Sequence, residues 1–307
     1  MRFWVYDHIG KAQPYIKALQ KAQHQQVTEL RHADLILLDY EHPARSEQLG
    51  YAEAHQIPVI LYPHGGNPLS FDSGQYGYEP DPHVRVQFVA GPGHITCFRE
   101  QGGPERKFVI SGFPWCEQRS FRPSREVSTV VFAPVHPSAS GYMGEVWREA
   151  NRTAQKQIWE LFPNARVLVS VYATLEQNGL LPIAGWEFHA SLQAISTALI
   201  DQADLVVATE TFACLAIARG TPTVMFSQRQ LDWDGTEFWG AKIVGPLLRY
   251  PYDLSDIDQV LEALEVEATA WRNRFIGPPF NPGLVVKTCE RALKEHLAGN
   301  QAVATNK

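Results

Sequence analysis

Several features that would place a sequence in a specialised class of protein are missing here. There is no block of lysine or arginine, and the formal net charge is −6 at pH 7, so charge disfavours a nucleic acid as a partner. No apolar run approaches the ~18 residues that a membrane-spanning helix needs. Residues 1–7 have the pattern of a strand and lack the apolar segment of a signal peptide. These absences predict a cytoplasmic protein without a membrane span.

Cysteine is scarce, and its spacing suggests neither a metal site nor a disulfide framework. The four cysteines lie far apart and form no C-x-x-C motif, a pattern typical of reduced thiols in a cytosolic protein. The triplet Asp232-Trp233-Asp234 has the Asp-x-Asp spacing of metal-dependent transferases, but it follows a strand predicted late in the chain. We therefore expect no metal and no other required cofactor. The cysteines are Cys97, Cys116, Cys214 and Cys289.

What the chain does contain is a regular alternation of apolar strands and helical patterns. Its 307 residues suffice for two domains of ordinary size, and an apolar fraction of 45% is typical of a soluble globular protein. Continuous apolar strands separated by helices indicate parallel sheets covered on both faces. The fold class that follows is α/β, with two Rossmann-like domains facing each other across a cleft. The expected division is an acceptor domain at 1–120, a donor domain at 121–282, and a closing helix with a flexible tail at 283–307.

The expected elements follow the hydrophobic periodicity of each half. In the first half we expect strands at 2–6, 34–39, 57–62, 84–90 and 107–111, and helices at 13–24 and 44–55. In the second half we expect strands at 129–133, 166–171, 204–208, 223–226 and 241–244, and helices at 144–162, 188–200, 212–219, 254–275 and 283–297. Residues 63–83 are aperiodic, as functional loops often are. Residues 112–128 read as a linker with few apolar anchors.

The turn Thr209-Glu210-Thr211 is the most informative stretch of the sequence. It lies between an apolar strand and a helix, where unpaired backbone N–H groups and the positive end of the helix dipole suit a phosphate. Ligands of open parallel sheets bind at the carboxyl ends of strands. An ordinary βαβ crossover is the alternative interpretation. Glu210 is either a ligand for hydroxyl groups or a solvated turn residue, and Thr211 is placed to cap the helix.

Other candidate residues also follow predicted strands. His64 is able to move protons near neutral pH, and its neighbours Gly65 and Gly66 let the backbone approach a ligand. His136 could donate a hydrogen bond to a phosphate or a sugar hydroxyl. Each histidine could instead be an ordinary loop residue bonded to the backbone. The remaining candidates are Gly91 and Gly93, in a Gly-x-Gly turn, and Gln228, which should border the same cleft as the Thr209–Thr211 turn.

The order of these pieces resembles that of GT-B glycosyltransferase-like proteins. The nearest likenesses are the teichoic-acid glycerophosphotransferases and the UDP-N-acetylglucosamine 2-epimerases, and the resemblance covers roughly residues 34–226. The residues that carry it are the His64-Gly65 element, the Gly91-x-Gly93 turn, Ser111-Gly112-Phe113-Pro114, Val135-His136-Pro137, and the Thr-x-Thr turn before Gly220-Thr221-Pro222.

The resemblance implies roles for several of these residues. His64 matches the histidine proposed as catalytic base in the glycerophosphotransferases, and His136 matches a strand-end histidine near the donor phosphates of the epimerases. Thr209, Glu210 and Thr211 fall where these families place small polar residues on the diphosphate. The sequence also departs from the families. Cys214 and Leu215 replace the acidic residue that binds the ribose, Tyr172-Ala173 replaces a second His-Pro, and epimerase-type carboxylates are not evident around His64.

The function expected from these observations is metal-independent glycosyl transfer from a nucleotide-activated sugar to an unidentified hydroxyl acceptor. An epimerase, a hydrolase or a polyol-phosphate transferase on the same fold is the first alternative. The second is a non-enzymatic two-lobed protein that binds a sugar or a nucleotide.

Overall fold

The chain forms two compact units. Unit 1 consists of Met1–Trp115 and Asn273–Lys307, and unit 2 consists of Cys116–Arg272. The boundaries therefore follow residues 115 and 272, where the sequence suggested 120 and 282. The computed structural model describes residues 1–7, 10–39, 45–63, 84–100, 107–122, 126–134, 142–171, 174–190, 193–208, 210–225, 269–270 and 272–305.

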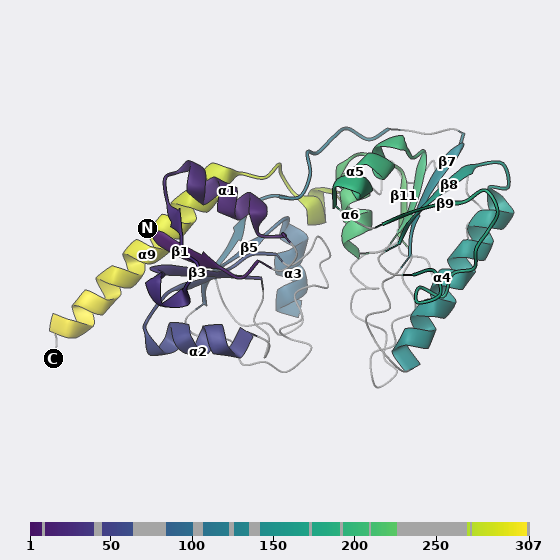
Figure 1. Cartoon of the computed structure of the whole chain (residues 1–307). Coiled ribbons are helices and arrows are strands. Elements are labelled where there is room, and N and C mark those ends of the chain that lie inside the picture. Colours follow the sequence, from purple (N-terminus) through teal and green to yellow (C-terminus); the bar gives the residue numbers. More distant parts are fainter. Residues whose placement is uncertain are drawn as a thin grey trace. The chain divides into compact units, whose positions relative to one another are not determined.

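Unit 1 is built on a parallel sheet of six strands (Figure 1). The strands are β1 (Arg2–Val5), β2 (Gln25–Gln26), β3 (Leu35–Leu38), β4 (Val59–Leu61), β5 (Val84–Val89) and β6 (Lys107–Ile110). They lie in the order β2-β1-β3-β4-β5-β6, and every neighbouring pair is parallel. The helical elements are α1 (Gln13–Lys21), the 3₁₀ turn η1 (Leu30–His32), α2 (Ser46–Ala54), α3 (Pro92–Glu100), the π-helical turn η6 (Arg272–Ile276), which begins at the last residue of unit 2, and α9 (Pro282–Thr305).

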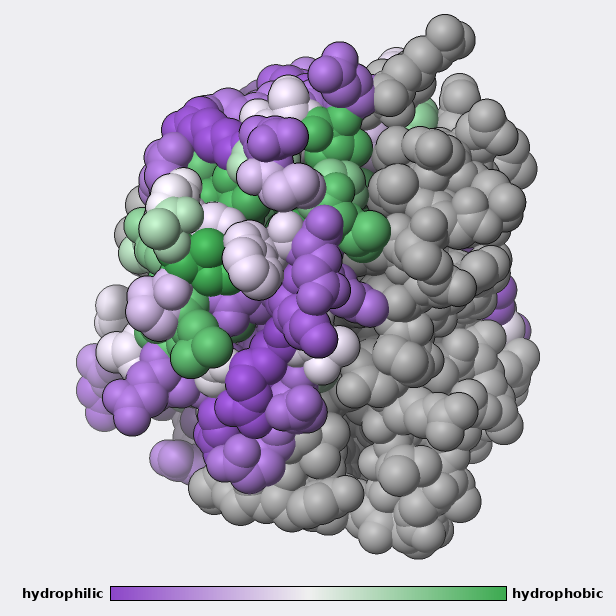
Figure 2. All heavy atoms as spheres, turned by 90° about the vertical axis from the view of Figure 1, so that its right-hand side faces the viewer, coloured by the Kyte–Doolittle hydropathy of each residue, from purple (hydrophilic) through white to green (hydrophobic). Residues whose placement is uncertain are grey.

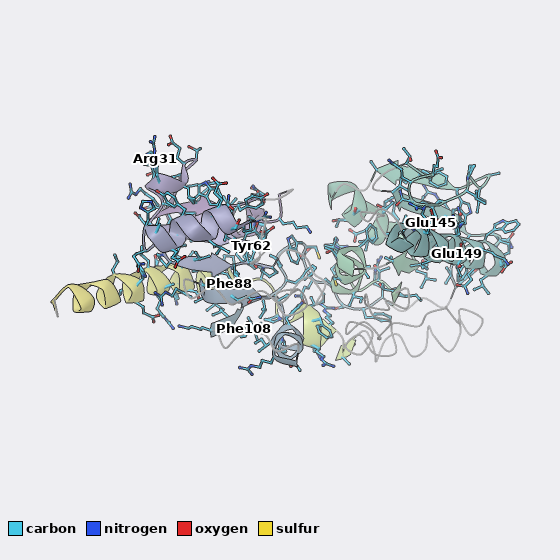
Figure 3. The ribbon with its side chains drawn as sticks, turned by 90° about the horizontal axis from the view of Figure 1, so that it is seen from below. Arg31, Tyr62, Phe88, Phe108, Glu145 and Glu149 are labelled. Carbon is cyan, nitrogen blue, oxygen red and sulfur yellow. The ribbon has the colours of Figure 1, made fainter. Side chains whose placement is uncertain are left out.

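The C-terminal helix α9 belongs to unit 1 because its apolar residues complete that unit's core. Val285 and Cys289 are fully buried in a cluster with α1 and the sheet. In the same cluster the ring of Tyr15 lies 5.5 Å from that of Tyr62 and 5.6 Å from that of Phe88. Tyr62 and Phe88 are labelled in Figure 3. Burial raises the pKa of Cys289 to about 12, so this thiol stays protonated.

Unit 2 is built on a second parallel sheet, of five strands (Figure 1). The strands are β7 (Thr129–Ala133), β8 (Arg166–Val171), β9 (Glu187–Ala190), β10 (Leu205–Ala208) and β11 (Thr223–Met225), in the order β11-β10-β7-β8-β9. The helices are α4 (Tyr142–Leu161), α5 (Gln193–Gln202) and α6 (Glu210–Ala218). On the face of unit 2 seen in Figure 2, hydrophobic residues are interspersed with hydrophilic ones.

The α/β class and the two Rossmann-like sheets are confirmed, whereas several local predictions are wrong. One helix was expected at 188–200, but β9 and α5 occupy this region, because the edge strand is polar and lacks an apolar run. Residues after 298, expected to fray, continue α9 to Thr305. The strand expected at 241–244 lies outside the described residues. Of the helix expected at 254–275, residues 269–270 and 272–275 are described and helical.

The strand orders mark where each sheet should bind a ligand. In unit 2 the chain runs outward through β7, β8 and β9, then returns to place β10 on the other side of β7. In unit 1 the chain similarly places β2 on one side of β1 and β3 on the other. Ligands of open α/β sheets bind at the carboxyl ends of the strands where the order reverses. The candidate positions are therefore the β7/β10 edge and the β1/β3 edge. Across the described part of the chain, no helix is both long and apolar enough to cross a membrane.

Candidate functional site

Three predicted donor-binding elements leave the same edge of the unit 2 sheet. Ala208, the last residue of β10, is in register with Ala133 at the end of β7 and with Met225 at the end of β11. The loops that contain the predicted residues follow these three strand ends directly. The predicted residues His136, Thr209 and Gln228, together with the side chain of Glu210, lie outside the described part of the structure.

The helix that follows β10 is accessible only at its N-terminal turn. Thr211 and Phe212 are half-buried, whereas every residue from Ala213 to Ala218 is buried. Cys214 and Leu215 face the interior, with exposures of 0% and 6%. The two residues that stand in place of the families' ribose-binding acid are thus core residues. The part of α6 that a ligand can reach is its positive end. Because the helix begins at Glu210, Thr211 lies in its first turn, and the prediction that Thr211 caps the helix is wrong.

Two polar side chains farther along the same sheet have buried polar atoms that make no hydrogen bond. Ser170 on β8 is in register with His189 on β9, and Ser170 is 2% exposed. Within the described part of the chain, neither Ser170 Oγ nor His189 Nε2 has a hydrogen-bond partner, although both atoms are buried. A buried polar atom without a partner costs about 1–3 kcal/mol, so a ligand or an ordered water that bonds to it is favoured. The sequence pattern did not predict this pair, because His189 was expected in a helix at 188–200.

Two charged residues lie near His189, Glu187 on the same strand and Arg166 on β8. Arg166 Nε and Nη2 donate to the two carboxylate oxygens of Glu187, at 2.6 and 3.0 Å. These hydrogen bonds lower the pKa of Glu187. His189 Nε2 lies 3.9 Å from Glu187 Oε2, close enough for an ion pair when the imidazole is protonated. The carboxylate of Glu187 therefore contacts both Arg166 and His189.

In unit 1, polar residues gather at the carboxyl ends of β1, β3 and β4. Arg45 Nε and Nη2 donate to the carboxylate oxygens of Asp39 at 2.9 and 3.0 Å, and the guanidinium carbon lies 3.4 Å from the centroid of the Tyr6 ring. The Tyr62 hydroxyl donates to the carbonyl of Tyr6. Burial, and then the charges of Asp39 and Asp7, raise the pKa of Tyr62, so it remains a phenol.

The two carboxylates of this edge both have structural partners. Asp39 is paired with Arg45, and Asp7 accepts hydrogen bonds from Ala12 N and Gln13 Nε2, both at 2.8 Å, at the start of α1. Neither carboxylate was among the candidate residues predicted from the sequence, although each acidic residue directly follows an apolar strand. The predicted base His64 and its neighbours Gly65 and Gly66 come soon after Tyr62 in the chain but lie outside the described residues.

The glycines of the Gly-x-Gly turn have an internal reason to be glycine. A Cβ at Gly91 would collide with the carbonyl oxygen of Arg274, and one at Gly93 would lie 2.5 Å from the Phe275 ring. The group that comes close to these two glycines is therefore another segment of the same chain, at Arg274 and Phe275. His94 is 1% exposed, and its Nδ1 accepts a hydrogen bond from Gly91 N at 3.2 Å. Among the residues described, no group of three or more His, Cys, Asp or Glu side chains could hold a metal ion.

Comparison with solved structures identifies the fold. The glycosyltransferase SnogD from Streptomyces nogalater has 14% identity and a TM-score of 0.52, over 95% of this chain and 99% of that one. The UDP co-structure of MnaA from S. aureus has 10% identity and a TM-score of 0.57, over 97% of this chain and 96% of that one. The fold is GT-B-like.

A third match supports the same conclusion. The UDP-GlcNAc 2-epimerase from Neisseria meningitidis bound to UDP-GlcNAc has 11% identity and a TM-score of 0.52, over 96% of this chain and all of that one (100%). No protein-family model and no curated protein sequence matches the chain. The fold expected from the sequence, and its resemblance to GT-B glycosyltransferases and 2-epimerases, are thus confirmed by structural similarity.

Proposed function

We propose that this protein is a glycosyltransferase that moves a sugar from a nucleotide-activated donor to a hydroxyl acceptor without a metal ion. The observation that carries the proposal is the position of α6. Its N-terminus follows β10 at the edge where the strand order of unit 2 reverses. A helix N-terminus at this place is suited to the diphosphate of the donor.

The chemistry follows from where negative charge develops. As the bond between the sugar and the diphosphate breaks, charge builds up on the leaving diphosphate. Backbone N–H groups at residues 209–211 and the helix dipole would stabilise that charge, because they are oriented before the reaction begins. His136 and Gln228, in the loops after β7 and β11, would add donors. His64 would take the proton from the acceptor hydroxyl, which contributes about 10²–10⁴-fold to the rate.

The unpartnered pair on β8 and β9 suggests which way the nucleoside lies. With strands about 4.8 Å apart, Ser170 is roughly 10 Å across the sheet from β10, about the distance from a diphosphate to a nucleobase. A nucleoside that extends in this direction would give Ser170 Oγ and His189 Nε2 the partners they lack. The proposal therefore places the diphosphate at α6 and the nucleoside toward β8 and β9.

An epimerase or a hydrolase is the main alternative, because Asp7 and Asp39 do lie at the carboxyl edge of unit 1. Both carboxylates are already engaged, Asp39 by Arg45 and Asp7 by the start of α1, which disfavours this reading. A polyol-phosphate transferase would use the same phosphate position. A two-lobed binding protein would take up the same nucleotides without turning them over.

The test has two stages. A thermal-shift screen with UDP, GDP, CDP, CMP and ADP would identify the nucleotide, since a ligand at 100 times its dissociation constant adds about 2.7 kcal/mol to stability. The corresponding nucleotide sugars would then be incubated with and without a panel of hydroxyl acceptors. Release of the nucleoside diphosphate only when an acceptor is present supports the proposal. Conversion without an acceptor indicates an epimerase or a hydrolase, and binding without conversion indicates a binding protein.

A further inference from the structure

The segment that joins β6 to β7 is held against unit 2 by its backbone. Arg119 N donates to Ala218 O at 2.9 Å, and Arg122 N donates to Gly220 O at 2.7 Å. Gly220 has a φ of +74°, and a Cβ at this position would collide with the carbonyl oxygen of Ser120. Only glycine therefore lets the segment come so close while keeping this backbone conformation.

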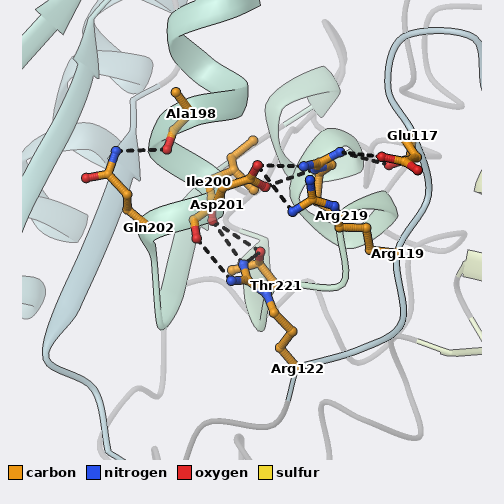
Figure 4. Close-up of polar contacts among 9 residues, drawn as sticks. All are labelled: Glu117, Arg119, Arg122, Ala198, Ile200, Asp201, Gln202, Arg219 and Thr221. Atoms are coloured by element: carbon orange, nitrogen blue, oxygen red, sulfur yellow. Dashed lines mark hydrogen bonds and ion pairs between the residues drawn. The ribbon is translucent and has the colours of Figure 1, made fainter.

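Arginine side chains fix the same segment to the end of α5 (Figure 4). Arg122 Nη1 donates to Asp201 O at 3.0 Å, and its Nη2 donates to Ile200 O at 3.2 Å and to Thr221 Oγ1 at 2.5 Å. The last carbonyls of a helix have no partner within the helix, so a guanidinium bonded to two of them caps α5 from outside.

Asp201 is the anionic centre of this cluster. Arg219 Nε and Nη2 donate to its two oxygens at 2.9 and 2.5 Å, and Arg119 Nη1 lies 3.3 Å away (Figure 4). Burial alone would raise the pKa of Asp201, but the hydrogen bonds and charge of Arg219, with Arg119 and Arg122, hold it below its ordinary value. The side chain is therefore ionised at neutral pH and can pair with the arginines around it.

The second stretch of chain that leaves unit 2 is hydrogen-bonded to the same segment. Arg272, the last residue of unit 2, donates to the carbonyl of Arg119 and, at 3.3 Å, to Gln118 Oε1. It also begins the π-helical turn η6, a rare geometry that is common at functional positions. Both stretches of chain that leave unit 2 are thus bonded to each other before they leave it.

On the other side of the first junction, Trp115 is anchored in unit 1. Its Nε1 donates to Lys11 O at 3.3 Å, and its ring meets that of Phe113 edge-on at 5.0 Å. Phe113 in turn pairs with Pro279, which follows the second junction. Well-packed residues therefore reach the junction from the unit 1 side as well.

We propose that residues 116–122 and Arg272 form a rigid bracket of unit 2, which holds together the two stretches of chain that leave this unit. The linker expected at 112–128 with few apolar anchors is thus corrected: Phe113 and Trp115 are buried in unit 1, and hydrogen bonds and ion pairs hold residues 117–122. This inference concerns the rigidity of unit 2 and does not depend on which reaction the protein catalyses.

The test uses two glycines of unit 2 that both have positive φ. Gly220→Ala should release the bracket, because its Cβ would collide with Ser120. Gly185→Ala is the control: its φ of +85° gives the same backbone strain, but nothing lies within 4 Å of its Cβ. Hydrogen exchange at the amides of Arg119 and Arg122 should be as slow as in the unit 2 strands in the wild type and in Gly185→Ala. It should be about tenfold faster or more in Gly220→Ala. Fast exchange at both amides in the wild type would overturn the proposal.

A second readout covers the case in which Gly220→Ala fails to fold. Burial raises the pKa of Cys116, the first residue of the bracket, to about 12, so its thiol should react slowly with iodoacetamide. Arg272→Gln should make Cys116 react about tenfold faster or more, measured by mass spectrometry, because it removes the guanidinium that donates to Gln118 and to the carbonyl of Arg119. The buried Cys289 of unit 1 should not change in the same samples. Unchanged reactivity of Cys116 in Arg272→Gln, or an equal rise at Cys289, would contradict a bracket specific to this place.

Discussion

Asp39 and Arg45 form a two-bond ion pair inside unit 1, with side-chain exposures of 0% and 5%. The pair joins the carboxyl end of β3 to the residue before α2, and the guanidinium also covers the Tyr6 ring. It therefore fixes the edge at which the strand order of unit 1 reverses. A buried pair of this kind is costly to break, because the remaining charge loses its partner.

Asp39→Asn should lower the free energy of unfolding by about 3–5 kcal/mol, because it removes the carboxylate that accepts two hydrogen bonds from the buried Arg45. The matched control is Asp34→Asn, which breaks the more exposed pair with Arg2, worth about 0–1 kcal/mol. Urea unfolding of both variants gives the comparison. Equal losses in the two variants would show that the buried pair does not stabilise the unit.

The stability contributed by Asp201 should depend on pH in a defined direction. Its pKa is lowered in the folded protein, so its contribution is present above the unfolded value of 3.8 and is lost as the pH falls through the folded value. The stability difference between the wild type and Asp201→Asn, measured in urea across this range, should be constant near neutral pH and shrink below about 3.8. A difference that grows on acidification would contradict the ion pairs assigned to Asp201.

Ser170→Ala should leave stability unchanged or slightly higher, because it removes a buried hydroxyl without a partner. Thr223→Val is the contrasting variant. It removes a buried hydroxyl that donates to Thr221 O at 2.7 Å and should cost about 1 kcal/mol. If a nucleoside lies over β8, Ser170→Ala should also weaken nucleotide binding about fivefold, as measured by calorimetry. Unchanged affinity would place the nucleoside elsewhere.

His64→Ala should reduce turnover by about 10²-fold or more with little change in melting temperature, if His64 is the general base. His94→Ala is the comparison. His94 is buried and bonded to Gly91 N, so its loss should mainly lower the melting temperature. Near-normal turnover in His64→Ala would mean that another group takes the proton.

The sequence predicted what local periodicity determines. The apolar strands at 129–133 and 166–171 were placed to the residue, and the alternation gave the correct fold class. Prediction from periodicity failed at β9, because this edge strand contains Glu187 and His189 and has no apolar run. An edge strand has one partner only, so its pattern is weaker than that of a central strand.

Contacts between distant residues were beyond the sequence for a different reason. Nothing near Arg122 indicates that it will bond to the end of α5, which lies about eighty residues later in the chain. The segment around it looked like a flexible linker because its anchors are polar. Asp39 could have been predicted as a site residue, because an acidic residue directly after an apolar strand is visible in the sequence. The proximity of Ser170 and His189 could not, because it depends on the strand order. The sequence marked Gly91 and Gly93 as glycines of a turn after a strand, but it did not indicate that they pack against Arg274 and Phe275.

Calorimetry of nucleoside diphosphate binding to Thr211→Val tests whether the donor diphosphate binds at the N-terminus of α6. The loss of a hydroxyl bonded to a charged phosphate should weaken binding about tenfold or more, with unfolding still cooperative. Thr96→Val, an exposed threonine on α3 of unit 1, should bind as the wild type does. If Thr211→Val and Thr96→Val both bind with wild-type affinity, the diphosphate does not lie at the N-terminus of α6.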